Sequence, residues 1–93
     1  MRTLQNMIEL SECEKAILKF SADWCQPCKT LAATLQEIDI PVLEIDVEND
    51  PDTAAQFHVR NLPTLYFFNK GEQKHKAVGN ISRREIEEIL ESI

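Results

Sequence analysis

The chain has 93 residues and a net charge of −6 at neutral pH. This length predicts one domain over residues 1–93, with a single modest core. An acidic chain without a basic patch is a poor candidate for binding nucleic acid through its phosphates. No apolar run is long enough for a transmembrane helix, and residues 1–6 lack the features of a signal peptide. Because three cysteines suit a reducing compartment, we expect a cytoplasmic protein without membrane association.

Residues 2–14 carry the weakest pattern in the chain. They predict a strand of two or three residues and then a short helix, lined by Leu4, Met7, Ile8 and Cys13. We interpret Cys13 as a small apolar or surface residue, and a regulatory thiol is the alternative.

Residues 16–20 predict a strand. They are almost continuously apolar, as is typical of a strand that is covered on both faces.

Two cysteines follow that strand in the segment Trp24-Cys25-Gln26-Pro27-Cys28, where a helical pattern begins. The unpaired N–H groups and the dipole at a helix start favour negative charge, so they should stabilise a thiolate at Cys25 more than at Cys28. Pro27 fits the first helical turn because it has no N–H to leave unpaired. We expect Cys25 at the exposed end and Cys28 one turn inside, where it can attack a mixed disulfide formed by Cys25.

A pair of cysteines at this spacing also occurs in zinc sites, which need four ligands. The other cysteine and histidine residues, Cys13, His58 and His75, form no second closely spaced pair. At a junction between a strand and a helix in a short α/β chain, the pair indicates a redox site. The sequence therefore predicts a redox-active dithiol and no metal site.

The rest of the chain alternates between helical and strand patterns. Apolar residues at helical spacing and capping residues such as Asp50 predict the helices, and β-branched or aromatic runs predict the strands. The predicted helices cover residues 29–38 and 51–57, and the predicted strands cover residues 41–47, 65–68 and 73–78. Charged residues in the last of these strands suit an exposed sheet edge.

The last helix has the clearest local signal. Ser82 and Glu85 form a capping box, and apolar residues follow at helical spacing at Ile86, Ile89, Leu90 and Ile93. The whole order predicts an α/β fold with a mixed sheet of four to five strands and helices on both faces.

Three segments resemble the thioredoxin family. The segment from Phe20 to Lys29 looks like its active site, and Leu62-Pro63-Thr64-Leu65 is similar to its cis-proline segment. Val78-Gly79, followed by Ser82, resembles the glycine loop before its last helix. The likeness is collinear from about Ile17 to Ile93, and only the N-terminal part is shorter than usual. It implies the thioredoxin fold and a thiol–disulfide oxidoreductase that reduces protein disulfides.

The resemblance also implies residue roles. Cys25 would be the nucleophile and Cys28 the resolving thiol. A cis Pro63 would place the backbone of Leu62 beside an extended substrate, and the further substrate-binding residues would be Trp24, Gln26, Pro27 and Gly79. Electrons would come from a thioredoxin-reductase-like partner, with disulfide-containing proteins as substrates, no bound cofactor and a monomeric chain.

Two departures from the family pattern concern the site. Gln26 stands where thioredoxins usually have glycine, and it is uncharged, which keeps the chain near the reducing end of the family. Lys19 stands where the family usually has a buried acid, and Glu44 where it usually has a lysine. Because a lone buried ammonium is costly, we expect the two to meet behind Cys28. There the cation could stabilise the Cys28 thiolate, or Glu44 could take its proton. In the alternative, Lys19 extends to solvent and has no role.

Two other functions stay open from the sequence. One is a glutaredoxin-like reductase recycled by glutathione, against which the lack of a tyrosine between the cysteines counts. The other is a thioredoxin-like binding subunit of a larger complex.

Overall fold

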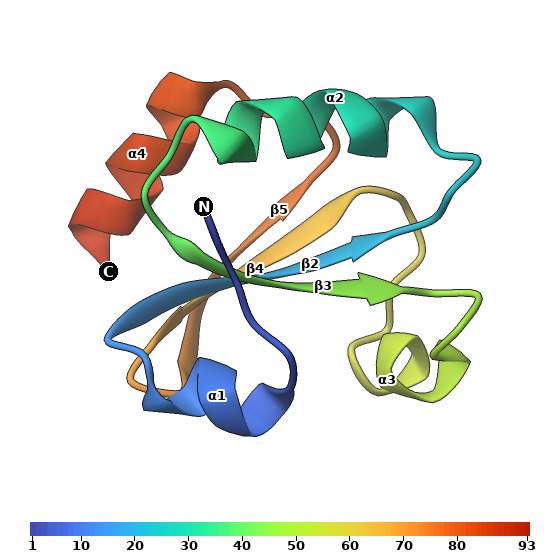
Figure 1. The fold of residues 1–93 in the computed structure, drawn as a ribbon, viewed down its shortest axis with the longest axis horizontal. Coiled ribbons are helices and arrows are strands. Elements are labelled where there is room, and N and C mark those ends of the chain that lie inside the picture. Colours follow the sequence, from blue (N-terminus) through green and yellow to red (C-terminus); the bar gives the residue numbers. More distant parts are fainter.

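The computed structural model describes residues 1–93 as a five-stranded mixed sheet with four helices (Figure 1). The strands are β1 (Arg2–Thr3), β2 (Lys15–Ser21), β3 (Pro41–Asp46), β4 (Thr64–Asn69) and β5 (Glu72–Val78). The helices are α1 (Met7–Glu12), α2 (Gln26–Gln36), α3 (Pro51–Gln56) and α4 (Arg83–Ser92). The predicted order of elements and the predicted mixed sheet are confirmed.

The strands lie in the order β1-β3-β2-β4-β5. β1, β3 and β2 are parallel, whereas β4 runs antiparallel to β2 and β5 antiparallel to β4. β2 lies in the centre, which explains why residues 16–20 are all buried. Lys19, on this strand, is paired in register with Glu44 of β3 on one side and with Leu65 of β4 on the other.

Each face of the sheet packs against its own pair of helices. α2 and α4 cover one face, and α1 and α3 cover the other (Figure 1). Side chains alternate between the faces along a strand, so Ile17 and Leu18 belong to different clusters. The cluster under α2 and α4 includes Leu31, Leu35, Phe67 and Ile86, and the opposite cluster includes Leu10, Phe20, Leu43 and Tyr66.

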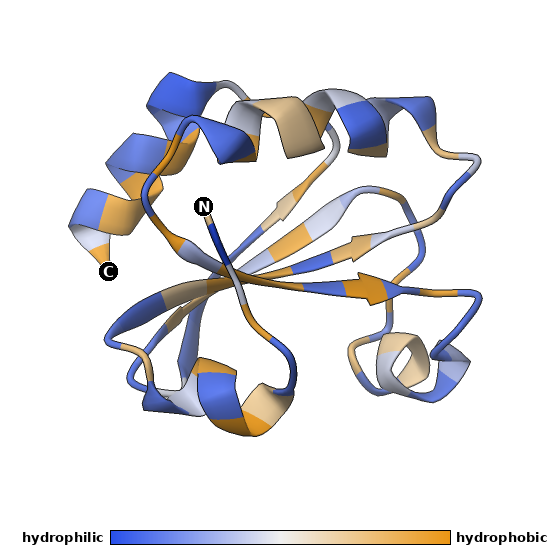
Figure 2. Ribbon diagram, in the orientation of Figure 1, coloured by the Kyte–Doolittle hydropathy of each residue, from blue (hydrophilic) through white to orange (hydrophobic).

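The helix starts follow the capping residues of the sequence. The Ser82 hydroxyl accepts the Glu85 N–H at 3.1 Å, and the apolar side of α4 turns toward the sheet while its polar side faces outward (Figure 2). At the start of α3 the Asp50 carboxylate accepts two hydrogen bonds from Thr53, from the N–H at 3.2 Å and from the hydroxyl at 2.7 Å. These bonds lower the pKa of Asp50 below its ordinary value.

Two predicted details were wrong. α1 buries Leu10, whereas Ile8 is 71% exposed and Met7 lies at the surface as well. α2 ends at Gln36 instead of reaching Ile38, because the Ile38 N–H bonds the Leu35 carbonyl at 3.1 Å in a tighter turn. Ile38 nevertheless stays in the core. None of the helices combines the length and apolar character that crossing a membrane requires.

Candidate active site

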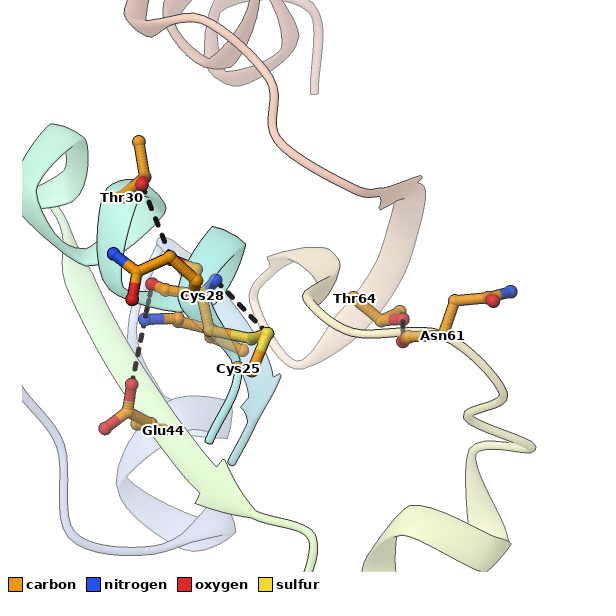
Figure 3. The surroundings of a disulfide bond; sticks show 8 residues. Cys25, Cys28, Thr30, Glu44, Asn61 and Thr64 are labelled. Atoms are coloured by element: carbon orange, nitrogen blue, oxygen red, sulfur yellow. Dashed lines mark hydrogen bonds and ion pairs between the residues drawn. A yellow bond between two sulfur atoms is a disulfide. The ribbon is translucent and has the colours of Figure 1, made fainter. Parts of the chain in front are cut away.

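Cys25 and Cys28 lie where the chain leaves β2 and enters α2. Cys25 is the N-cap residue of α2, and its Sγ accepts a hydrogen bond from the Cys28 N–H at 3.2 Å (Figure 3). The two residues form a disulfide, with their Cα atoms 5.3 Å apart. An N–H donor and the positive end of the helix dipole therefore converge on the Cys25 sulfur, where both would stabilise a thiolate.

Cys25 is less exposed than we expected. It is 4% exposed and Cys28 is 2% exposed, because Val47 and Leu62 pack over the pair. Both residues lie far from the cysteines along the chain, so the sequence around the motif does not predict that they bury the pair. Trp24, by contrast, is 67% exposed.

A groove of about 570 Å³ opens above Cys25, and we call it the front groove. It is mostly apolar, and Arg60 is the one charged residue in its lining. The predicted residues in its wall are Trp24, Cys25, Gln26, Pro27 and Leu62, and the others are Val47, Ala54, Val59, Arg60 and Asn61.

Pro63 and Gly79 lie outside the lining of the front groove. The Leu62–Pro63 peptide bond is cis, as the resemblance implied, and Pro63 is buried. Its carbonyl accepts the Gly79 N–H at 2.8 Å, which connects this segment to the chain before α4. Gly79 has φ +85°, a left-handed conformation that glycine adopts without strain. Neither the N–H nor the carbonyl of Leu62 has a backbone partner within the chain.

A second, smaller cavity of about 200 Å³ lies on the other side of the disulfide, and we call it the rear cavity. Cys28 contributes to its lining, and Cys25 does not. Most of the other residues around it are charged or polar: Lys19, Ser21, Asp23, Lys29, Glu44 and Asp46, together with Ala22 and Ala32.

Lys19 and Glu44 meet in the rear cavity. The Lys19 Nζ lies 2.9 Å from Glu44 Oε2 and donates a hydrogen bond to the Cys28 carbonyl at 3.2 Å. The Lys19 side chain is 3% exposed, so it does not extend to solvent, whereas Glu44 is 54% exposed. Figure 3 shows the Glu44 carboxylate pointing from β3 toward the start of α2. The expected contact is present, and its effect on the thiols stays a prediction.

Comparison with known proteins agrees with this geometry. The family model Thioredoxin matches residues 3–92. The chain belongs to the thioredoxin family. It is 29% identical to a thioredoxin of Mycoplasmoides gallisepticum, over 97% of this chain and 99% of that one. A thioredoxin of Staphylococcus saprophyticus is 37% identical, over 81% of this chain and 78% of the relative.

Solved thioredoxin structures have the same architecture. A mutant thioredoxin from Halobacterium salinarum NRC-1 superimposes with a TM-score of 0.85 at 31% identity, over 98% of this chain and 88% of that chain. The thioredoxin family consists of disulfide oxidoreductases, and the Cys25–Cys28 pair that this chemistry needs is present. The chain is therefore a thiol–disulfide oxidoreductase of the thioredoxin fold.

Several residues of the site were missed from sequence. Val59, Arg60 and Asn61 directly precede Leu62, a predicted substrate-binding residue, so their position in the sequence could have placed them at the site. Asp46 also had a signal, because it lies two residues after Glu44 and therefore on the same side of β3. Ala54 had none, since it reaches the front groove only through the packing of α3 beside β3.

The remaining cysteine and histidines lie away from the disulfide pair. Cys13 is half-buried, and its Sγ accepts a hydrogen bond from the Arg2 guanidinium at 3.2 Å. His58 follows α3 with φ 54°, and His75 on β5 packs edge-on against Phe67. No three histidine, cysteine or acidic side chains are grouped in a way that could hold a metal ion.

Proposed function

We propose that residues 1–93 act as one domain that reduces protein disulfides, with Cys25 as the nucleophile and Cys28 as the resolving thiol. The observation that carries the proposal is the position of Cys25. Its sulfur caps α2, accepts the Cys28 N–H and lines the front groove, so it is the sulfur that meets a substrate first. A thiolate there is stabilised without any further cofactor.

The reaction transfers two electrons from the dithiol to the substrate. The Cys25 thiolate attacks one sulfur of the substrate disulfide, whose S–S bond breaks as a mixed disulfide forms and the first substrate thiolate leaves. The Cys28 thiol loses its proton and attacks the Cys25 sulfur. The mixed disulfide breaks, the second substrate thiolate leaves and takes up a proton, and the Cys25–Cys28 disulfide forms.

Substrate binding would use the front groove and the backbone beside it. Trp24, Gln26, Pro27 and Leu62 supply contact area around the reacting sulfur. The N–H and carbonyl of Leu62 lack backbone partners within the chain, so an extended substrate segment can pair with them as an added strand would. Pro63 and Gly79 would act from behind, by fixing the loop that presents Leu62.

The oxidised protein has to be reduced again, and we assign this step to a thioredoxin-reductase-like partner. The two sulfurs carry the electrons, so the cycle needs no cofactor on this chain. We place the protein in the cytoplasm as a monomer, because an unpaired Cys13 and a dithiol that returns to the reduced state both suit a reducing compartment.

Reduction of insulin disulfides, with dithiothreitol as the electron source, tests the proposal. The wild-type protein is expected to accelerate the reaction, and Cys25→Ser is expected to abolish the acceleration. Cys28→Ser should instead form mixed disulfides that persist, because no resolving thiol is left. Cys13→Ser is the matched control and keeps full activity.

Two outcomes would overturn the assignment. One is an unaltered rate with Cys25→Ser. The other is a set of protein partners that bind equally well without either cysteine, which would indicate a binding subunit of a larger complex.

The equilibrium reduction potential of the Cys25–Cys28 pair separates the two redox functions. A reductant of protein disulfides should have a potential below that of the glutathione couple, as thioredoxin has. A value at or above the glutathione couple would favour a protein that is recycled by glutathione.

A further inference from the structure

Arg60 is the one charged residue in the lining of the front groove. The residue is exposed, and none of the ion pairs in the structure includes it. No carboxylate lines the front groove, since the other residues in its wall are uncharged. The guanidinium is therefore free to pair with a negative charge on a bound substrate.

Arg60 and Leu62 share a segment whose backbone is open to a substrate. Neither residue belongs to a helix or strand, and neither bonds another backbone group through its N–H or its carbonyl. The Asn61 carbonyl between them is occupied, because it accepts the Thr64 hydroxyl at 2.6 Å (Figure 3). Residues two apart in an extended segment direct their backbone groups to the same side, so Arg60 and Leu62 can face one substrate strand.

The position of Leu62 also indicates where a substrate would meet Arg60. Leu62 packs against the Cys25–Cys28 pair, so the substrate cysteine that Cys25 attacks lies opposite Leu62 or next to it. The residue opposite Arg60 is then about two or three positions from that cysteine, because the pattern along paired strands repeats every two residues. Backbone pairing at Leu62 supplies binding, and the side chain opposite Arg60 supplies the choice between substrates.

Two properties of the chain make this contact selective. The apolar walls of the front groove lower the local dielectric, so an ion pair formed there is stronger than one at an open surface. The net charge of −6 repels acidic substrates as a whole. A preference for a carboxylate at one position would therefore come from Arg60 and would oppose the overall field of the protein.

We propose that Arg60 selects protein disulfides in which an aspartate or glutamate lies about two or three residues from the cysteine that Cys25 attacks. The guanidinium pairs with this carboxylate, which it can bind through two parallel hydrogen bonds, while the backbone of Leu62 pairs with the substrate chain. The inference rests on the proposed function and names the class of substrate that the site prefers.

Cysteine peptides carried as mixed disulfides with 2-thiopyridine test the proposal, because the leaving thiopyridone is uncharged and its absorbance follows the attack by Cys25. The peptides are amidated at the C-terminus, so that a glutamate side chain is their only carboxylate. One series places glutamate at each position within about three residues of the cysteine, a second replaces it with glutamine, and a third places glutamate far from the cysteine. We expect the best-placed glutamate to raise kcat/KM about fivefold over its glutamine counterpart, and the increase to fall as salt is added.

Variants of the protein assign the preference to one side chain. Arg60→Gln should remove the difference between the glutamate and glutamine peptides, and Arg60→Glu should reverse it in favour of a lysine peptide. Arg84→Gln is the matched control, because it removes the same charge from α4, outside the front groove, and should keep the wild-type preference. A merely structural role for Arg60 would change the rates of all the peptides alike. Thermal unfolding of each variant checks that the fold is intact.

Three results would overturn the proposal: equal rates for glutamate and glutamine at every near position, an equal gain from a glutamate far from the cysteine, or a preference that survives in Arg60→Gln. Insulin reduction by the wild-type protein is the separate control on the proposed function. If the wild type reduces insulin and shows no preference among the peptides, only the role of Arg60 fails.

Discussion

The front groove and the rear cavity border the same disulfide, but their linings differ in chemical character. The front groove is large and mainly apolar, with Arg60 as its one charged residue. The rear cavity has about a third of that volume, and five charged side chains face it. A protein substrate is recognised by apolar area and by backbone groups, whereas a proton needs charged groups and water. A bound substrate would therefore meet apolar area on one side of the pair, whereas charged groups lie on the other.

This division follows from the alternation of side chains along the strands. Lys19 and Ser21 lie on the side of β2 that faces α2, and Glu44 and Asp46 lie on the corresponding side of β3. All four are near the carboxyl ends of parallel strands, the edge where α/β proteins commonly place their sites. The front groove instead draws its far wall from α3 and from the segment before Pro63.

The largest effect on the front side is expected from Trp24→Ala. Trp24 is exposed and borders the front groove, so its loss removes contact area for the substrate without opening the core. We expect kcat/KM for insulin reduction to fall about tenfold, which corresponds to about 1.4 kcal/mol of transition-state binding. KM should carry most of the change, and the deficit should be equal at all pH values.

The pH profile of Trp24→Ala tests whether this residue acts through contact area alone. A deficit that changes with pH, or an unchanged kcat/KM, would contradict that role.

A smaller effect, on stability, is expected from Lys19→Met. Methionine fills a similar volume without a buried charge, and Glu44, which is half-exposed, remains solvated after losing its partner. Because the variant leaves no uncompensated charge buried, the free energy of unfolding should stay within about 1 kcal/mol of the wild-type value.

Urea unfolding measures the stability, and Lys74→Met is the matched control at an exposed pair. A loss of several kcal/mol with Lys19→Met would show that the pair has a structural role first.

Much of the fold could be predicted because each element has its own local signal. The apolar run at residues 16–20 predicted the central strand, and the capping box at Ser82 and Glu85 predicted the start of α4. The resemblance to the family and the cost of a lone buried ammonium predicted the contact of Lys19 with Glu44, and the two residues are in register on β2 and β3. α1 was harder, because a helix of six residues has too few turns for its apolar side to be identified, and Leu10 was missed.

The site could be predicted only as far as the motif reaches. Cys25 and Cys28 were found from their spacing, but the burial of Cys25 depends on Val47 and Leu62, which approach it only in the folded chain. Ala54 likewise lines the front groove only because α3 packs beside β3. Long-range packing of this kind leaves no periodic trace in the sequence near the motif.

The smallest effect is expected at Asp50, which caps α3 and so supports one wall of the front groove. Bonds from the Thr53 hydroxyl and N–H hold the folded pKa of Asp50 below its unfolded value of 3.8. The stabilisation is therefore complete above pH 3.8 and is lost as pH falls through the lower, folded pKa. Asp50→Ala should lower the midpoint of thermal unfolding by a few degrees at neutral pH, and the difference should vanish in acid.

Asp50→Asn is the matched control, because asparagine also caps helices but carries no charge to titrate. It should lose less stability than Asp50→Ala, and the loss should not depend on acid in the same way. An Asp50→Ala variant as stable as the wild type at neutral pH would contradict the capping role of Asp50.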